Sequence, residues 1–317
     1  MTRAGALRLL IAVVLTAWVV WAANPSQVMA ETADADWRWI TAAVALVLAD
    51  RALMAYRWMV LLRALTPGTR PPLAAVLRIF FASTFVGSFL PSLAGDVYRA
   101  YSLSRLHVSG VESAASVLMD RALGILSMVV VAVVALSFAP NVRGMPGVLP
   151  TVLIATAGCV VAAAGIYSEH VAAFATSMAS VLPGRRARAL SVGLVDAVRR
   201  YARHHGELTA VLVASIGVQV LRVVQAYCLG RALGLSVPAS VYFVFVPLVV
   251  IVMQIPVTTM GLGTGQLAFD VFFGAVGVPS ADAVALSILF VALAIVGNLP
   301  GGLVYLTGRQ PSYLQLK

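Results

Sequence analysis

The sequence predicts an all-α polytopic membrane protein with about seven to nine transmembrane or re-entrant helices. Three observations predict this class: an apolar composition, long apolar runs along the chain, and arginines that flank those runs. The chain has 317 residues, of which 61% are hydrophobic and 11% are charged. Soluble domains are about half apolar and about a quarter charged, so this composition excludes a sizeable soluble domain.

Each apolar run is a candidate membrane segment, since a helix needs roughly 20 apolar residues to cross a bilayer. We expect the first run to be retained as a crossing, because the residues after it form a poor signal-peptide cleavage site. With the loop that follows, it would form an N-terminal membrane anchor over residues 1–36. The runs lie at 7–23, 37–62, 76–94, 117–139, 148–167, 209–230, 241–260 and 284–306, with a weaker one at 267–277.

Basic residues orient these segments, because cytoplasmic loops carry an excess of arginine and lysine. Arg3 and Arg8 place the N-terminus in the cytoplasm, and Arg309 and Lys317 place the tail at 307–317 there too. The net charge of +10 is carried by arginines beside apolar runs, which suits loops that face the anionic headgroups of a cell inner (plasma) membrane. Nucleic-acid binding is not expected, because no basic soluble module is present to carry it.

The run at 76–94 does not behave as a simple crossing. It begins at Arg78 and is followed by Arg99, so both of its flanks are basic. Pro91 removes a backbone donor inside it, and Gly95 follows shortly after. We therefore expect a re-entrant or broken segment whose backbone polar groups face protein or a watery cavity.

The region 241–277 contains a second interruption of the same kind. Pro256 is followed by the glycines Gly261 and Gly263, which break a helix and expose backbone groups. A re-entrant segment and two extra crossings both end the chain inside, so the sequence leaves these alternatives open.

Matching landmarks indicate two repeats of opposite orientation, at 37–139 and 209–306. The sequence Arg-Ala-Leu occurs at 63–65 and again at 231–233, and the Pro/Gly interruption follows in each half. A Gly-Val-x-Ser-Ala element comes next, at 110–114 and 277–281. An odd number of crossings separates the halves, so they would be inverted, as in transporter folds whose site lies between broken helices. Chance similarity between apolar sequences is the alternative.

Residues 140–208 would connect the two repeats. They contain a transmembrane run and then a basic stretch, which we expect to be cytoplasmic. Apolar residues recur there at roughly helical spacing between arginines: Leu190, Leu194, Val195, Val198 and Tyr201. An interfacial amphipathic helix and a solvated connector both fit this pattern.

Ionisable residues inside apolar runs mark the candidate binding site, because charge in a membrane is costly and usually faces a cavity or a partner. If a helix begins near Gly95, Asp96 and Arg99 lie on its first turn, where Arg99 and backbone donors could hold a lipid phosphate. Arg57, Asp120 and Arg121 would assist. Two structural alternatives remain: the carboxylates and arginines pair only with each other, or Arg57 anchors the chain at the membrane interface.

The second half carries neutral polar groups in place of most of these charges. Gln225 and Gln266 are the residues that we expect to contact the headgroup. Further polar residues lie within the runs of both halves: Asp50, Arg51, Gln219, Arg222, Gln254 and Asn298.

Six of the candidate site residues, Arg57, Asp96, Arg99, Asp120, Arg121 and Gln266, belong to stretches that resemble the UPF0104 membrane family, which is related to the transmembrane flippase region of lysylphosphatidylglycerol synthases. The resemblance covers roughly residues 37–306 and is carried by Arg57-Trp58 and by the stretches at 85–91, 95–99, 114–121 and 260–266. It implies translocation of a lipid, either an anionic phospholipid or a polyprenyl-phosphate-linked lipid. The family pattern commonly has a glutamate near Gln266, so a carboxylate role at that position is not expected here.

The sequence therefore predicts a flippase-like or scramblase-like lipid transporter and not an enzyme. It contains no HExxH, Walker-type or GxSxG signature, so no catalytic residue, metal or cofactor is expected. The two cysteines, Cys159 and Cys228, lie in apolar runs and form no metal-ligand cluster. Two alternatives stay open: a non-transporting scaffold or regulator of a cell-envelope enzyme, and a membrane-embedded transferase acting on lipid-linked sugars.

Overall fold

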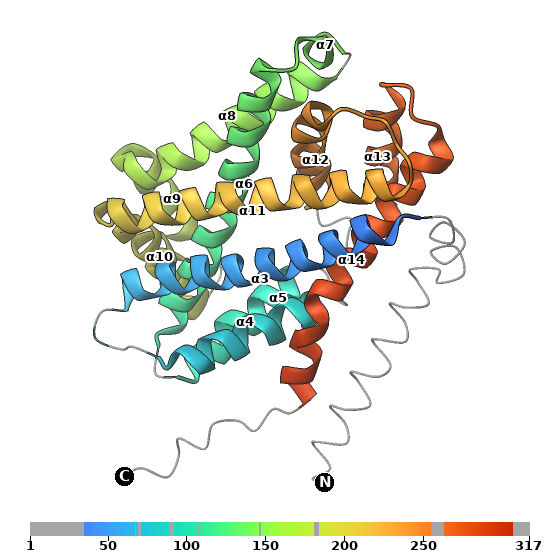
Figure 1. The fold of residues 1–317 in the computed structure, drawn as a ribbon. Helices are drawn as coiled ribbons and strands as arrows, with labels where there is room; N and C mark the ends of the chain where they lie inside the picture. The colour runs from blue at the N-terminus through green and yellow to red at the C-terminus, as the bar shows by residue number, and fades with distance from the viewer. Residues whose placement is uncertain are drawn as a thin grey trace.

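The protein is entirely helical over the residues that the computed structural model describes, which are 35–66, 68, 71–88, 92–106, 108–145, 147–180, 184–254 and 263–306. The helices pack into a bundle (Figure 1). Their bounds are α3 Trp37–Leu65, α4 Leu73–Gly87, α5 Ser92–Ser104, α6 Gly110–Ser137, α7 Pro140–Arg143, α8 Val148–Tyr167, α9 Glu169–Ser180, α10 Arg185–Arg200, η1 Tyr201–Arg203, α11 His205–Ala232, α12 Ala239–Met253, α13 Thr264–Gly274 and α14 Ser280–Leu306.

The chain is a multi-pass membrane protein by the length and composition of its helices. Among the described residues, α3, α6, α11 and α14 are long and apolar enough to cross a bilayer. A fifth span results if α8 and α9, which meet at an 85° bend, are counted as one. The predicted polytopic all-α class is confirmed, while the run at 7–23 lies outside the described residues.

Polar caps fix where two of the long helices begin. The Asp36 side chain accepts a hydrogen bond from the Arg38 backbone N–H at 2.9 Å, at the start of α3. The Ser109 hydroxyl accepts from the Glu112 backbone N–H at 3.1 Å, at the start of α6. Each cap satisfies a donor that the first helical turn leaves without an intrahelical partner.

The run at 76–94 is divided between two short helices, as the sequence predicted. The 15-residue α4 ends at Gly87 and α5 begins at Ser92, while Pro91 lies outside the described residues. The role predicted for Gly95 is wrong, since this residue lies inside α5 and does not interrupt it. A Cβ at Gly95 would come within 2.7 Å of the Ser83 carbonyl oxygen and 3.0 Å of the Gly87 Cα. Gly95 is therefore the contact that lets α4 and α5 cross closely.

The second interruption falls between α12 and α13. Pro256 and Gly261 lie outside the described residues. Gly263 adopts a φ of +85° directly before α13, a conformation that favours glycine.

The two halves of the chain share one order of helices: long, short, short, long. The lengths are 29, 15, 13 and 28 residues for α3 to α6, and 28, 15, 11 and 27 residues for α11 to α14. Their packing is reciprocal, because α4 packs on α14 of the other half while α12 packs on α6, and α3 lies beside α11 (Figure 1). This agrees with the predicted repeat. The inversion of the halves relative to the membrane stays a prediction.

The basic stretch at 185–203 is packed on the bundle. Ala197 and Tyr201 are fully buried between α10, α6 and α3, and the Tyr201 hydroxyl donates to the Leu61 carbonyl at 2.9 Å. Burial raises the pKa of Tyr201 above its ordinary value, so the hydroxyl stays a neutral donor. Much of the apolar face of α10 is thus covered by protein, although Leu190 at its beginning is exposed.

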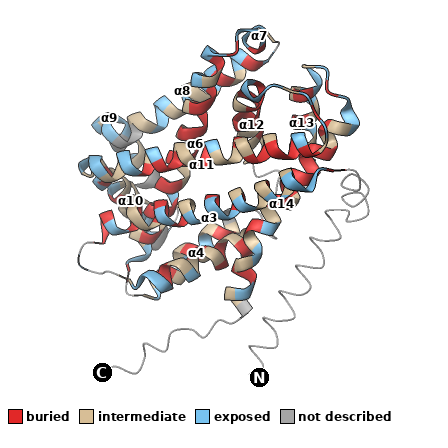
Figure 2. Cartoon of the chain, viewed as in Figure 1, coloured by how far each residue is buried: buried red, intermediate tan, exposed pale blue. Residues whose placement is uncertain are grey.

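Buried residues gather where the two halves meet. Figure 2 shows them on the helix faces that are turned toward one another, with many along α11, α12 and α14. Buried polar side chains interrupt this apolar packing, and six of them line one cavity: Asp50, Arg51, Ser83, Ser88, Arg99 and Gln225.

Candidate functional site

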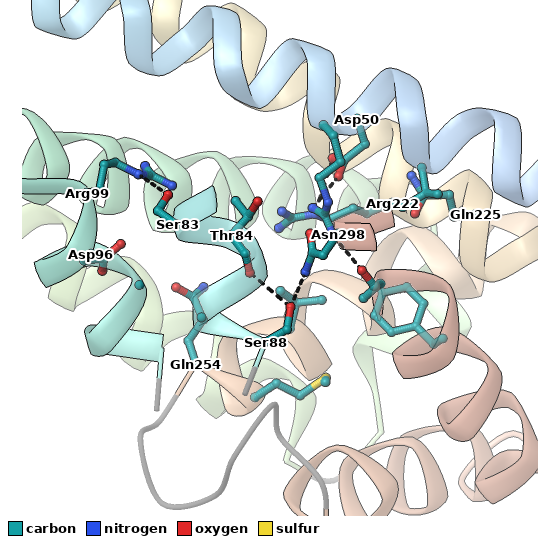
Figure 3. A pocket seen from close by; sticks show the side chains of 18 residues that line it. Asp50, Ser83, Thr84, Ser88, Asp96, Arg99, Arg222, Gln225, Gln254 and Asn298 are labelled. Carbon is teal, nitrogen blue, oxygen red and sulfur yellow. Dashed lines mark hydrogen bonds and ion pairs between the residues drawn. The ribbon is translucent and has the colours of Figure 1, made fainter. Parts of the chain in front are cut away.

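A cavity of about 320 Å³ lies between the two halves. It is lined from α3, α4 and α5 on one side and from α11, α12 and α14 on the other, as Figure 3 shows. Its volume lies at the lower end of the range of small-molecule sites, about 300–1,000 Å³. The polar residues that line it are Asp50, Arg51, Ser83, Thr84, Ser88, Asp96, Arg99, Arg222, Gln225, Gln254 and Asn298.

Arg99 is held firmly at one end of the cavity. It is 5% exposed, and its Nε donates to the Ser83 hydroxyl at 3.1 Å. Its guanidinium carbon lies 4.9 Å from the ring centroids of both Trp58 and Phe80, which gives it two cation–π contacts. Its Nη1 lies 3.4 Å from Asp120 Oδ2. These contacts fix the side chain at the cavity wall before any ligand binds.

Asp120 also binds Arg57, at the back of this wall. Arg57 Nε donates to Asp120 Oδ1 at 2.7 Å, and Arg57 Nη1 donates to the Ser215 hydroxyl at 3.1 Å. Arg57 is only 4% exposed, so it is no interface anchor. Neither Arg57 nor Asp120 is among the residues that line the cavity. Their network positions Arg99 from behind.

Asp96 lines the cavity and forms an ion pair with Arg121, which stands behind it. Because α5 begins at Ser92, Asp96 and Arg99 lie beyond the first turn, and the predicted site at the start of a helix is wrong for these two residues. The alternative that these charged residues pair with one another is correct, since Asp96 pairs with Arg121 and Arg99 pairs with Asp120. Asp96 and Arg99 also face the cavity (Figure 3).

A second charged group lies at the other end, where α3 meets α11. Asp50 is 1% exposed and pairs with Arg51 Nη1 at 2.9 Å and with Arg222 Nε at 3.5 Å. Charges in the middle of apolar runs are the signal in the sequence that points to this group. The sequence did not reveal that Asp50 and Arg222 meet, because they come from opposite halves of the chain.

Neutral polar residues of the second half complete the lining. Gln225 is 3% exposed on α11, and Asn298 projects from α14, where its Nδ2 donates to the Ser88 hydroxyl at 2.6 Å. Gln254 Nε2 lies 3.2 Å from Met128 Sδ. Gln225 was predicted for the site, whereas Gln254 and Asn298 were noted only as polar residues within runs.

Gln266 is not part of the cavity lining, so its predicted contact with the headgroup is not supported at this cavity. Its Oε1 accepts a hydrogen bond from the Gly263 backbone N–H at 3.0 Å, at the start of α13. This bond satisfies a donor that the helix leaves free, so Gln266 has a structural role there.

The cavity thus contains three of the seven predicted substrate-contacting residues, Asp96, Arg99 and Gln225, and three more support them from behind. Among the described residues, no three histidine, cysteine, aspartate or glutamate side chains converge as metal ligands would. The lining offers guanidinium groups, carboxylates and amides in an apolar bundle, a set that can bind a polar group by charge and hydrogen bonds.

Comparison with known families gives one match. A family model described as the lysylphosphatidylglycerol synthase TM region matches residues 5–301. Searches of curated proteins and of solved structures found no significant match.

Proposed function

Because this chain belongs to the family of lysylphosphatidylglycerol synthase transmembrane regions, we propose that it is a transporter that moves a phosphate-bearing lipid between the leaflets of the bilayer. The substrate would be an anionic phospholipid or a polyprenyl-phosphate-linked lipid. The protein would act by transport and not by catalysis, in the inner membrane, with both termini in the cytoplasm.

The observation that carries this proposal is the charged cavity between the two halves. Three arginines and two carboxylates line it: Arg51, Arg99 and Arg222 against Asp50 and Asp96. The excess of one positive charge suits a headgroup that carries one negative charge. Charged side chains inside a membrane protein are energetically costly, so their presence in this cavity favours a functional role for them.

Arg99 and Arg222 are the cations best placed to contact a phosphate. Arg99 is already oriented by Ser83 and two aromatic rings, so little further ordering is needed when a ligand binds. Arg222 Nη2 lies 3.2 Å from Met54 Sδ, which is a weak acceptor that a phosphate oxygen can readily replace. The planar guanidinium matches two phosphate oxygens at once.

Either arginine can be removed without leaving a carboxylate unpaired. Without Arg99, Asp120 keeps Arg57, and without Arg222, Asp50 keeps Arg51. Arg99→Gln and Arg222→Gln are therefore expected to fold.

Arg188→Gln, at an exposed position on α10, is the matched control because it removes the same charge.

The test measures translocation of a fluorescent anionic phospholipid in proteoliposomes, by quenching from the outside. Each cavity variant should slow translocation by about tenfold or more, since a hydrogen bond to a charged group contributes about 1.5–3 kcal/mol. The control should match the wild type. Wild-type rates in both cavity variants would overturn the assignment to this cavity. No translocation by the wild type of this phospholipid or of a polyprenyl phosphate would overturn transport itself and favour a scaffold.

A further inference from the structure

Buried polar atoms without a hydrogen bond are concentrated at one end of the cavity. Five such side-chain atoms occur among the described residues, and four belong to residues that line it. They are Asp50 Oδ1, Arg51 Nε, Gln225 Nε2 and Asn298 Oδ1. An unsatisfied buried polar atom is costly, so four together indicate that a ligand supplies the missing bonds.

The orientation of the Asn298 amide is fixed by its neighbours. The Ser88 hydroxyl donates to the Thr84 carbonyl at 3.0 Å, so its oxygen must accept from Asn298, and the atom 2.6 Å away is Nδ2. The free atom of this amide is therefore the acceptor, Oδ1. Asp50 Oδ1 adds a second acceptor, with Arg222 Nε near it at 3.5 Å as an ion pair. Arg51 Nε–H is a donor by chemistry alone.

A mixed set of donors and acceptors distinguishes between headgroup chemistries. The oxygens of a singly charged phosphodiester only accept hydrogen bonds, and an ammonium group only donates them. An ammonium group would also meet two arginines against one carboxylate here, since Asp50 is already paired with Arg51 and Arg222. A hydroxyl both donates and accepts, so adjacent hydroxyls satisfy the whole set.

The predicted repeat matches Gln225, a neutral residue beside the charged Asp50 and Arg51, with a charged residue of the first half. The sixth residue before Arg63 is Arg57, and the sixth before Arg231 is Gln225. The tenth residue after Gly110 is Asp120, and the tenth after Gly277 is Ser287. The first half therefore has a closed ion pair, Arg57 with Asp120, where the second half has an amide and a hydroxyl.

The neutral pair does not close in the same way. The Ser287 hydroxyl donates to Val284 O within its own helix at 2.7 Å. The Gln225 amide N–H is left without a partner, at a residue that is 3% exposed and lines the cavity.

We propose that Asp50, Arg51, Gln225 and Asn298 form a hydroxyl subsite, which binds adjacent hydroxyls in the headgroup of the transported lipid, as in a glycerol or sugar headgroup. This inference rests on the proposed transport of a phosphate lipid and adds its substrate class. The phosphate contacts Arg99 or Arg222, and the hydroxyls beyond it select the lipid.

The test compares two lipids of equal charge in detergent, by titration of the purified full-length chain. Phosphatidylglycerol carries two adjacent hydroxyls, and phosphatidylpropanol has the same three-carbon headgroup without them. The wild type should bind phosphatidylglycerol about tenfold tighter or more, because a site built for hydroxyls rejects an analogue that lacks them. A double variant, Gln225→Met with Asn298→Leu, should lose this preference while its affinity for phosphatidylpropanol stays unchanged.

Unchanged phosphatidylpropanol binding also shows that the double variant is folded. Equal binding of both lipids by the wild type, or a full preference in the double variant, would overturn the subsite and leave lipid transport standing. Binding of neither lipid by the wild type would overturn the subsite, and it would also overturn an anionic phospholipid as the substrate. A final titration adds free glycerol as a competitor of phosphatidylglycerol. Free glycerol is not expected to displace the lipid, and displacement at concentrations similar to those of the lipid would assign the subsite to a soluble polyol.

Discussion

At the scale of single residues, Asp120 is the carboxylate on which two buried arginines converge. Its two oxygens contact Arg57 at 2.7 Å and Arg99 at 3.4 Å. Opposite charges packed this closely offset the cost of taking each of them out of water. The carboxylate therefore matters more for stability than either arginine does, since it is the partner that they share.

Replacing Asp120 with alanine should leave both arginines buried without their common partner. We expect the free energy of unfolding to fall by about 3–5 kcal/mol, the usual cost of an uncompensated buried charge. Thermal unfolding in detergent, followed by scanning fluorimetry, measures this. Asp196→Ala, at an exposed position on α10, should change stability by no more than about 0.5 kcal/mol. A melting temperature of Asp120→Ala equal to that of this control would contradict the assignment.

The sequence predicted the residue types of the site better than their partners. The position of Asp96 and Arg99 directly after the Pro/Gly interruption identified them as candidates. The pairing of Asp50 with Arg222 depends on α3 lying beside α11, a contact between distant parts of the chain that no local pattern encodes. Gln266 was misplaced for a related reason, because a glutamine that caps its own helix looks the same in sequence as one that faces a cavity.

At the scale of elements, close helix crossings determine how the two halves fit. On α14, a Cβ at Gly301 would lie 2.0 Å from the Phe81 carbonyl oxygen of α4, and one at Gly302 would lie 2.7 Å from the Phe85 ring. Backbone cannot move aside as a flexible side chain can. The α4–α14 contact thus requires glycine, as helix crossings in membranes often do.

Gly301→Ala should force α4 and α14 apart and lower stability by about 1–3 kcal/mol, the usual cost of overpacking. Gly158→Ala on α8 is the matched control, because a Cβ there would meet no heavy atom of the described residues within 4 Å. The control should be neutral or stabilise by up to about 1 kcal/mol. Chemical unfolding in mixed micelles compares the two, and equal effects would contradict the close crossing.

Hydropathy located eight of the twelve described α-helices, which are α3, α4, α6, α8, α11, α12, α13 and α14. Apolar runs and their charged flanks are local features, whereas α5, α7, α9 and α10 had no apolar run of their own. Hydropathy could not tell a glycine that breaks a helix from one that packs against another helix. Gly95 shows the difference, because its neighbour Gly87 is close in space only after α4 turns back into α5. The predicted interruption fell in the right place, and the reason given for Gly95 was wrong.

At the scale of the whole molecule, the recurring order of helices and their reciprocal packing agree with two repeats around a central cavity. An inverted arrangement would let each half present equivalent helices toward opposite leaflets. Such an arrangement requires two connecting segments to lie on opposite sides of the membrane: 140–147, which contains α7, and 181–204, which contains α10 and η1.

Cysteine labelling in whole cells tests this topology. In a background without the two native cysteines, Asn141→Cys should react with an impermeant maleimide from outside, and Asp196→Cys should react only after the membrane is opened. Both positions are exposed, so access to the reagent depends on the side of the membrane. Reaction of Asp196→Cys in intact cells would place the basic stretch outside and contradict the predicted orientation.

Reversible blockage of the cavity tests the central claim, transport through the space between the halves, most directly. Thr84 lines the cavity, and Thr84→Cys changes little volume. In the background without native cysteines, its proteoliposomes should translocate the fluorescent phospholipid at the parent rate. A bulky thiol reagent should stop translocation, and a reductant that removes the reagent should restore it. Asp196→Cys, labelled to the same extent, should stay active. Continued translocation by fully labelled Thr84→Cys would contradict transport through this cavity.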